Sequence, residues 1–271
     1  MIKRFIRKFL SRMENVFGNN ELYDLMLHKQ FLDLQASHCN PLNKSKLFGF
    51  AQNEEDGITL EILKRIGLEK GFFIEFGVGN GLENNTIILL ASGWKGSWFG
   101  GEDIDFDSTG SKKLSFEKVW IKRDNISDLY KSTSNNADVI SLDLDGNDIY
   151  LVDELLANGA QPKLFIVEYN AKFPPSLEFK ITYNEGHRWQ SDDYFGASLK
   201  TYCKVFEKFG YRLVCCNLTG ANAFFVHQSF QKDFSDIPTD IDQLYCEPFY
   251  FLRKHKMHPT SAKTIEELIF N

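Results

Sequence analysis

The segment that most constrains the fold of this chain is FFIEFGVGNGLENNT, residues 72–86. Four of its first five residues are apolar, three glycines follow at alternate positions, and a polar cluster comes next. Short apolar runs of this kind are typical of buried strands, and glycines directly after a strand let the backbone approach a ligand closely. The segment therefore predicts a strand–turn–helix unit with a binding site at the turn.

Glycine spacing separates two kinds of nucleotide site. A dinucleotide-binding turn has the pattern GxGxxG, in which the third glycine comes five positions after the first. Here the glycines are Gly77, Gly79 and Gly81, and Leu82 stands where the dinucleotide pattern requires glycine. Glu75 adds a carboxylate two residues before the first glycine, where it would repel a pyrophosphate. The turn suits a cationic amino-acid cofactor better than a dinucleotide.

Strands and helices are separated along the rest of the chain. Apolar runs and helical periodicity occur, in chain order, at 83–92, 97–100, 117–121, 138–142, 148–158 and 163–169. This order predicts a parallel sheet with helices on both faces. After a helical stretch at 193–209, strands at 211–217 and 222–228 are joined by LTGA, a connection suited to antiparallel neighbours. The expected fold class is α/β, with a mostly parallel, Rossmann-like sheet that ends on an antiparallel strand.

Acidic and amide side chains follow two of the predicted strands. They are Asp143, Asp145, Asn147 and Asp148 after one strand, and Glu168 and Asn170 at the end of the next. Because ligands of open α/β sheets bind at the carboxyl ends of strands, we expect these side chains to face one crevice. Converging carboxylates repel one another unless a cation, a proton or a donor-rich substrate lies between them.

Composition limits the partners. A net charge of −6 argues against nucleic acid as a partner, because binding phosphates needs a broad basic surface. Five cysteines without CxxC spacing indicate a reducing compartment. No stretch approaches the ~20 apolar residues of a membrane span, and the start, MIKRFIRKFLSR, lacks the features of a secretory signal. We therefore expect a cytoplasmic protein.

The same twelve residues segregate charged from apolar side chains on a helix. Such a helix predicts either peripheral contact with an anionic membrane surface or packing on the domain itself or on a second subunit. A homodimer is one expected form of the protein.

Most of the chain resembles the FkbM-type branch of class I S-adenosylmethionine-dependent methyltransferases, particularly those of bacterial capsule and surface-polysaccharide biosynthesis. The segments that carry the resemblance are QNEEDGI, FIEFGVGNGLENNTIILLASGWKGSW, SLDLDGND, VEYNAKFPP, YFGASL and GYRLVCCNLTGANAFFV. It implies a seven-stranded sheet whose last strand is antiparallel. We expect a helical N-terminal cap at 1–66, a methyltransferase domain at 67–230 with an acceptor-pocket insertion at about 171–192, and a C-terminal extension at 231–271.

The implied reaction is methyl transfer from S-adenosylmethionine to a hydroxyl of a nucleotide-activated sugar, for example a heptose. An alternative acceptor is a phosphorylated or phosphoramidate-bearing capsule intermediate. A protein of a different class, a catalytically silent methyltransferase fold that serves as a binding subunit, is the remaining alternative.

Matched motif by motif, the resemblance implies a cofactor site made of Glu75, Gly77, Gly79, Gly81, Asn85, Thr86, Glu102, Asp103, Asp124, Asn125 and Asp143. Glu75 is expected at the methionine part of the cofactor. Either Glu102 or Asp103 is expected to accept hydrogen bonds from the ribose, with Glu102 favoured. Asp124 and Asn125 are expected near the adenine.

Methyl transfer to a sugar hydroxyl needs a base that takes the proton or a metal that lowers the hydroxyl pKa. The candidate catalytic residues are Asp145, His187, Asp143 and Glu168, with Asp145 and His187 as rival bases. The resemblance also implies Mg²⁺ or Mn²⁺ on Asp143, Glu168 and Asn170, although Tyr169 and Asn170 stand where related metal enzymes carry a second acid. Without a metal, the same acids are expected to contact the substrate.

The acceptor pocket is expected to include amide, basic and aromatic side chains, because an activated sugar offers hydroxyls, phosphates and a base to stack on. The candidates are Asn147, Asn170, Lys172, Arg188, Trp189 and Tyr194.

Overall fold

A computed structural model describes residues 21–45, 47–133, 136–250 and 259–270 of the chain. The basic and apolar segment at 1–12 lies outside the described residues. The strands are β1 (Phe72–Phe76), β2 (Lys95–Gly100), β3 (Leu114–Lys118), β4 (Val139–Leu142), β5 (Leu164–Glu168), β6 (Tyr211–Cys216) and β7 (Asn222–His227). The helices are α2 (Glu21–Ser37), α3 (Glu55–Arg65), α4 (Ile87–Ala91), α5 (Ile126–Ser132), α6 (Asp148–Ala157), α7 (Leu199–Lys208), α8 (Ile241–Leu244) and α9 (Ala262–Phe270), with 3₁₀ turns η1 (Pro41–Lys44) and η2 (Gln228–Phe234).

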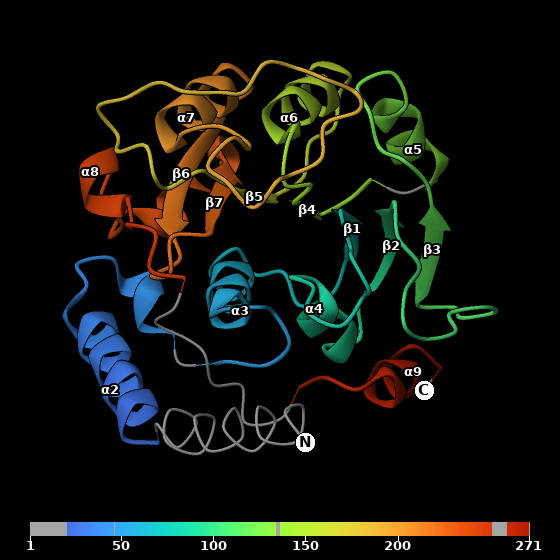
Figure 1. Ribbon diagram of the computed structural model, residues 1–271, viewed down its shortest axis with the longest axis horizontal. Helices are drawn as coiled ribbons and strands as arrows, with labels where there is room; N and C mark the ends of the chain where they lie inside the picture. Colours follow the sequence, from blue (N-terminus) through green and yellow to red (C-terminus); the bar gives the residue numbers. More distant parts are fainter. Residues whose placement is uncertain (1–20, 46, 134–135, 251–258, 271) are drawn as a thin grey trace, which may run out of the picture.

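The strands form one seven-stranded sheet in the order β3-β2-β1-β4-β5-β7-β6. All neighbours from β3 to β5 are parallel, and β7 runs antiparallel to both β5 and β6. Helices cover both faces: α5, α6 and α7 lie on one side of the sheet, and α3, α4 and α9 on the other (Figure 1). The predicted fold class, a mostly parallel Rossmann-like sheet with an antiparallel last strand, is confirmed.

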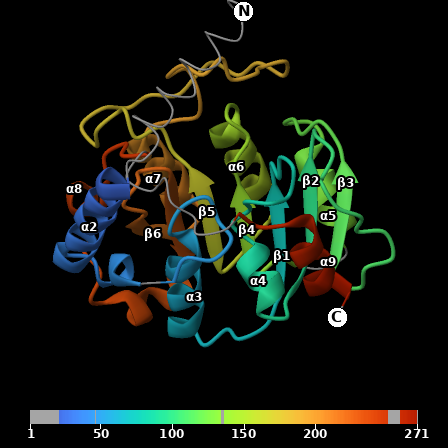
Figure 2. The ribbon, with the colours of Figure 1, turned by 60° about the horizontal axis from the view of Figure 1, so that its bottom comes forward.

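The centre of the sheet explains why its strands read as apolar runs. β1 is paired on both edges, with β2 and β4, and helices cover both of its faces (Figure 2). Phe73, Ile74 and Phe76 are fully buried in consequence. A strand buried on both faces must be apolar throughout, so Glu75, the one carboxylate of β1, requires hydrogen-bond partners inside the protein.

Three predicted elements differ from the structure by three residues or more at one end or both. The third strand covers Leu114–Lys118 rather than 117–121, because β3 is an edge strand whose side chains are mostly exposed and no longer form an apolar run. The helix expected at 193–209 begins at Leu199, where the side chain of Ser198 accepts a hydrogen bond from the Thr201 N–H. The helix expected at 83–92 covers only Ile87–Ala91, because residues 83–86 complete the glycine turn.

The segments outside the sheet share its core. Phe31 of α2, Ile58 of α3 and Ile265 of α9 belong to the same cluster of buried side chains as the strands. α9 lies beside the loop before β3, where Ser111 Oγ donates to the Ile269 carbonyl at 2.8 Å. The division into cap, domain and extension stays a prediction. Within the described ranges, no helix has the length and apolar character needed to cross a membrane.

Candidate active site

The glycine turn after β1 uses each of its first two glycines for a different reason. A Cβ atom at Gly77, where φ is +89°, would lie 1.6 Å from the carbonyl oxygen of Asp143. The ends of β1 and β4 can approach so closely only if that residue is glycine. Gly79 also has a positive φ, +48°, but a Cβ there would meet nothing within 4 Å. Gly77 thus allows close backbone packing, and Gly79 leaves open space.

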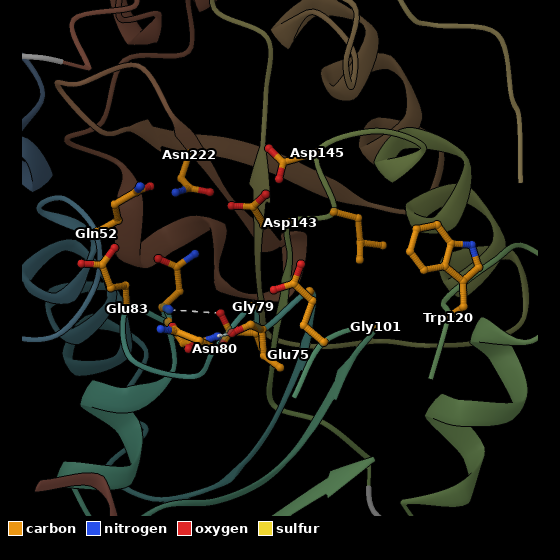
Figure 3. Close-up of a pocket in the computed structure, with 16 residues that line it drawn as sticks. Gln52, Glu75, Gly79, Asn80, Glu83, Gly101, Trp120, Asp143, Asp145 and Asn222 are labelled. Atoms are coloured by element: carbon orange, nitrogen blue, oxygen red, sulfur yellow. Dashed lines mark hydrogen bonds between the residues drawn. The ribbon is translucent and has the colours of Figure 1, made fainter. Parts of the chain in front are cut away.

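A cavity of about 390 Å³ lies over this turn, within the usual range for small-molecule sites. Its lining residues are Gln52, Glu75, Gly77, Val78, Gly79, Asn80, Glu83, Asn84, Asn85, Gly101, Glu102, Trp120, Asp143, Leu144, Asp145 and Asn222. We call it the turn cavity. Gly101 and Trp120 lie at one end, and Gln52, Glu83 and Asn222 lie at the other (Figure 3).

Glu75 lies under the middle of the turn cavity and is almost fully buried. Its carboxylate accepts hydrogen bonds from the backbone N–H groups of Asn85 at 3.0 Å and Thr86 at 3.2 Å, and from the Thr86 hydroxyl. Trp98 Nε1 in turn donates to that hydroxyl at 2.8 Å. Burial raises the pKa of Glu75 to about 7, although these donors oppose the shift. The acid thus holds the turn against the start of α4.

The structure separates the two acids expected at the ribose. Glu102 lines the turn cavity. Asp103 forms an ion pair with Lys118 of β3, with 2.6 Å between the carboxylate and the ammonium, and is not among the lining residues. Of the two acids, only Glu102 lines the cavity, and its role at the ribose stays a prediction.

The residues expected near the adenine do not line the turn cavity. Asp124 forms an exposed ion pair with Lys122 at 3.1 Å. Asn125 folds its own loop: Oδ1 accepts from the Lys122 N–H at 2.8 Å, and Nδ2 donates to the Trp120 carbonyl at 2.9 Å. Loop Asp and Asn side chains commonly bond to nearby backbone in this way. From this segment it is Trp120 that lines the cavity, and its side chain is partly exposed.

A second cavity, of about 750 Å³, adjoins the first. It is lined by Gln52, Asn53, Asp145, Glu168, Asn170, Lys172, Trp189, Ser191, Asp192, Asp193, Phe195, Ala221, Pro248 and Tyr250. We call it the insertion cavity, because six of these residues come from the segment at 172–195 that follows β5. Gln52 and Asp145 line both cavities, so the two meet there.

Three carboxylates lie together near this junction. Asp143 and Asp145 follow β4, Glu168 ends β5, and one oxygen of each lies within 4.8 Å of the others. Burial, together with repulsion from the neighbouring carboxylates, raises the pKa of both Asp143 and Glu168 well above the usual range. Glu168 Oε2 is buried and has no hydrogen-bond partner among the residues described. The cluster therefore holds a proton or attracts a cation.

Asp148 holds the loop that carries Asp143 and Asp145 through hydrogen bonds to its backbone. Its buried carboxylate accepts from the Leu144 N–H at 2.7 Å and the Gly146 N–H at 2.8 Å. Asp145 itself has a φ of +52°, which is uncommon for a residue other than glycine. Such backbone strain is found mostly where the surrounding structure imposes it, often at functional sites.

The expected metal ligand Asn170 is held by the insertion: Nδ2 donates to the carbonyls of Asp193 and Phe195, and Oδ1 accepts from the Lys172 N–H at 3.2 Å. Asn170 thus holds the insertion against the end of β5, and it also lines the insertion cavity. Its role as a metal ligand stays a prediction. The acid that lies beside Asp143 and Glu168 is Asp145.

Of the expected acceptor residues, Lys172 and Trp189 line the insertion cavity. Lys172 is paired with Asp193, and Trp189 Nε1 donates to the Asp192 carbonyl at 2.6 Å. Both side chains are thus held by the insertion loop itself.

The other three acceptor candidates line neither large cavity. Asn147 exchanges hydrogen bonds with the backbone of Asn184 and so fixes the insertion to the start of α6. The Arg188 guanidinium stacks over the Trp120 ring, 4.8 Å from its centroid. The Tyr194 hydroxyl accepts from the Thr182 N–H at 3.2 Å.

His187 lies apart from the junction. It lines a small cavity of about 80 Å³ together with Trp120 and Glu185, and its ring packs on Gly146, where an added Cβ would meet His187 Cδ2 at 2.5 Å. Its Nε2 is buried without a hydrogen-bond partner in the described part of the chain. Asp145 lines both large cavities and is therefore better placed as a base than His187.

Several lining residues were not among those expected from the sequence, including Gln52, Asn84, Trp120 and Asn222. Asn222 begins β7 beside Glu168 of β5, and Gln52 precedes α3. Asn222 begins an antiparallel strand and Gln52 is distant in sequence, so the rule for carboxyl ends of parallel strands gave no signal for them. The aromatic ring after β3 was a readable signal for Trp120.

No known protein-family model matches the sequence, and no curated protein matches it. The FkbM-type resemblance therefore stays a prediction. The solved structures that are similar at low identity include the following three. The methyltransferase domain of bacterial CtHen1-C is 17% identical over 65% of this chain and 97% of that domain, with a TM-score of 0.42.

The MycE methyltransferase from the mycinamycin biosynthetic pathway, in complex with Mg, SAH and mycinamycin VI, is 12% identical over 61% of this chain and 47% of its own, with a TM-score of 0.39. An O-methyltransferase family protein from Burkholderia thailandensis is 10% identical over 58% of this chain and 51% of its own, with a TM-score of 0.36. This chain thus spans about half the length of these two proteins. At these identities and TM-scores the likeness assigns no activity to it.

Proposed function

We propose that this chain is an S-adenosylmethionine-dependent O-methyltransferase whose acceptor is a hydroxyl of a sugar. The observation that carries the proposal is the junction of the two cavities at Asp145. The turn cavity has the glycine turn and the acid Glu102 expected of an adenosyl cofactor site, and the insertion cavity is large enough for a second small molecule. A methyl group at the junction would face both.

The reaction needs positioning and one proton acceptor. S-Adenosylmethionine would supply the methyl group: the acceptor oxygen would bond to the methyl carbon as the sulfur–carbon bond breaks, and the sulfur would leave as a neutral thioether. The hydroxyl proton must move to a base, because a sugar hydroxyl is a weak nucleophile at neutral pH. Holding the two reactants in adjoining cavities supplies the remaining rate enhancement through orientation.

Asp145 is the proposed base. It lines both cavities, and burial raises the pKa of its carboxyl, while the electrostatic interaction with His187 opposes that shift. A carboxylate with a raised pKa is a better proton acceptor near neutral pH. His187 would act through Asp145 rather than on the substrate.

A divalent cation fits the same cluster. Asp143, Asp145 and Glu168 offer three oxygens within 4.8 Å of one another, and oxygen ligands of this kind suit Mg²⁺ or Mn²⁺. A cation there would stabilise negative charge on the acceptor oxygen. Asp143 and Glu168 would hold it, which leaves Asp145 as the base, and the raised pKa values of these two ligands mean that a proton must leave as the cation binds.

The lining of the insertion cavity favours a hydroxyl-rich acceptor. Four carboxylates line it, from Asp145, Glu168, Asp192 and Asp193, and they accept hydrogen bonds from hydroxyls. Lys172 is the one cation among the described lining residues, and Asp193 already neutralises it. The nucleotide-activated sugar of surface-polysaccharide biosynthesis is our finer proposal, with the diphosphate directed away from these acids or toward a bound cation.

Calorimetry tests the cofactor. S-Adenosylmethionine and S-adenosylhomocysteine are expected to bind in preference to NAD. A screen of nucleotide sugars, free sugars and sugar phosphates with radiolabelled S-adenosylmethionine then tests the acceptor. Tighter binding of NAD would overturn the proposed cofactor, and cofactor binding with no label transfer to any sugar would favour a binding subunit.

The metal is tested on the same transfer. Activity is expected to fall after treatment with a chelator and to return with Mg²⁺ or Mn²⁺. Unchanged activity in the chelator would reassign Asp143 and Glu168 to direct contact with the substrate.

A further inference from the structure

The two ends of the turn cavity differ in chemistry. Glu102 and the Trp120 ring line it near Gly101, and they suit a ribose and a flat base. Gln52, Glu83 and Asn222 form the opposite end (Figure 3). If the adenosine occupies the first end, the amino-acid part of the cofactor extends toward the second.

Glu75, the acid expected to meet that amino-acid part, is already engaged. Its carboxylate accepts three hydrogen bonds from Asn85 and Thr86, as described above. An α-ammonium carries three donors and needs acceptors that are free. Such acceptors have to come from elsewhere in the lining.

Two buried amide oxygens meet this need. Asn222 Oδ1 and Asn84 Oδ1 have no hydrogen-bond partner among the residues that the structure describes, although both residues line the turn cavity and are more than nine-tenths buried. Buried polar atoms nearly always have a hydrogen-bond partner. Two amide oxygens without one in the same cavity therefore point to a ligand that carries hydrogen-bond donors.

The orientation of each amide is fixed by its other atom. Asn222 Nδ2 donates to Glu55 Oε1 at 3.0 Å, and Asn84 Nδ2 donates to the Val78 carbonyl at 3.2 Å. Because carboxylate and carbonyl oxygens only accept, each NH₂ group faces its acceptor and leaves the amide oxygen for the ligand.

Glu55 also fixes the backbone that carries Asn222. Its Oε1 accepts from Asn217 Nδ2 at 2.7 Å, and Asn217 Oδ1 accepts from the backbone N–H groups of Ala221 and Asn222, both at 2.9 Å. Glu55 itself is fully buried at the start of α3. One carboxylate thus sets both the position of the turn between β6 and β7 and the direction of the Asn222 amide.

Resting on the proposed function, we infer that Asn222 and Asn84 bind the α-ammonium of the adenosyl cofactor through their amide oxygens, and that Glu55 is the positioning residue for Asn222. The recognised group is the primary ammonium, not the adenosine. The sequence motif around Glu75 then shapes the turn. The positive charge of the ammonium is bound by Asn84 and Asn222, which lie more than 100 positions apart in the chain.

Ligand analogues test this assignment in the wild-type protein. Calorimetry would compare S-adenosylhomocysteine with its analogue that lacks only the α-amino group, and with 5′-methylthioadenosine, which lacks the amino-acid end. Loss of hydrogen bonds to a charged group predicts roughly 10-fold or weaker binding of the deamino analogue. Equal binding of the two homocysteine ligands would overturn the inference.

Variants locate the effect. Asn222→Leu and, separately, Asn84→Leu are expected to weaken S-adenosylhomocysteine about 10-fold and to leave the deamino analogue and 5′-methylthioadenosine within about twofold. Glu55→Gln is expected to give the same selectivity, since the glutamine NH₂ group would have to face either Asn222 Nδ2 or the Asn53 N–H, both of which are donors. A merely structural loss would weaken all three ligands equally, and that outcome would also overturn the inference.

Asn43→Leu is the matched control. Asn43 is buried, its Nδ2 donates to the Cys216 carbonyl of β6 at 2.8 Å, and it does not line the turn cavity. It reports the cost of losing a buried asparagine in the same region without a change in ligand selectivity. If wild-type protein bound none of the three adenosyl ligands, the proposed function would fail, whereas normal binding with no selectivity in any variant would reject this inference alone.

Discussion

The turn cavity and the insertion cavity are built differently, although they share Gln52 and Asp145. Most of the turn cavity comes from short segments at the ends of adjacent parallel strands, where backbone meets backbone. The insertion cavity is assembled from side chains that hold loops together, such as Asn170 to Asp193 and Phe195. Adding or removing a single atom should therefore have the largest effect in the turn cavity. Substitutions in the loops of the insertion cavity should have smaller effects.

The largest effect is expected at Gly77. Gly77→Ala would place a Cβ 1.6 Å from the Asp143 carbonyl oxygen, a backbone atom that cannot move without separating β1 from β4. We expect a loss of about 4 kcal/mol or more in the free energy of unfolding, measured by urea denaturation. Stability near that of the wild type would show that the ends of the two strands can separate with little loss in the free energy of unfolding.

Gly79→Ala is the matched comparison within the same turn. Its Cβ would meet nothing within 4 Å, so only the positive φ of +48° is strained. The expected cost is about 1–2 kcal/mol. Because the added methyl enters space proposed for the cofactor, its effect on S-adenosylhomocysteine affinity should exceed its effect on stability.

The next largest effect is expected at the junction. Asp145→Asn removes the proposed base and should lower kcat for methyl transfer by about 10²–10⁴-fold, while the affinity for S-adenosylhomocysteine changes little. The measurement is single-turnover transfer to whichever acceptor the screen identifies. A variant with wild-type kcat would remove Asp145 from the mechanism.

His187→Ala distinguishes the rival base. His187 lines neither large cavity, so we expect a fall in kcat of less than about tenfold, with a shift in the pH profile because the interaction that opposes the raised Asp145 pKa is lost. A larger loss for His187→Ala than for Asp145→Asn would reverse the two assignments.

The same difference between the cavities explains what sequence can predict. The strand and glycine turn at 72–86 were readable, because periodicity and glycine spacing are local signals. The cluster of Asp143, Asp145 and Glu168 followed from the rule that parallel strands end at one edge.

The sequence did not predict the contacts of the insertion, or the end of the turn cavity that includes Asn222 (Figure 3). Asn147, Asn170 and Arg188 were sensible acceptor candidates by residue type, yet hydrogen bonds and stacking within loops engage them. Asn222 gave no signal, because its role depends on Glu55, which is 167 residues away in the chain. Loop contacts are set by tertiary packing and leave no local pattern.

Glu54, a buried acid, allows a test of how burial of a carboxyl changes the stability of the protein with pH. Glu54 accepts a hydrogen bond from the Thr219 N–H at 3.2 Å, and burial together with the neighbouring Glu55 raises its pKa to about 8. A carboxyl whose pKa is raised on folding stabilises the protein fully below its unfolded pKa of 4.5, and this contribution is lost as the pH rises through 8.

Glu54→Gln should therefore gain stability relative to the wild type as the pH rises. We expect the difference in unfolding free energy to change by about 3 kcal/mol between pH 5.5 and 8.5, measured by urea denaturation at each pH. Glu69→Gln, at an exposed position, serves as the control. A difference that is flat across this range would mean that Glu54 does not change its protonation there.

The smallest effect separates two adjacent acids at the adenosine end of the turn cavity. Glu102 lines the cavity, whereas Asp103 is paired with Lys118 outside it. Glu102→Gln is expected to weaken S-adenosylhomocysteine about tenfold, the cost of losing charged hydrogen bonds to a ribose. Asp103→Asn should change that affinity by less than about twofold, since exposed ion pairs contribute little. Calorimetry on both variants decides which of the two acids contacts the ligand. A larger loss of affinity for Asp103→Asn would mean that the loop changes conformation when the ligand binds.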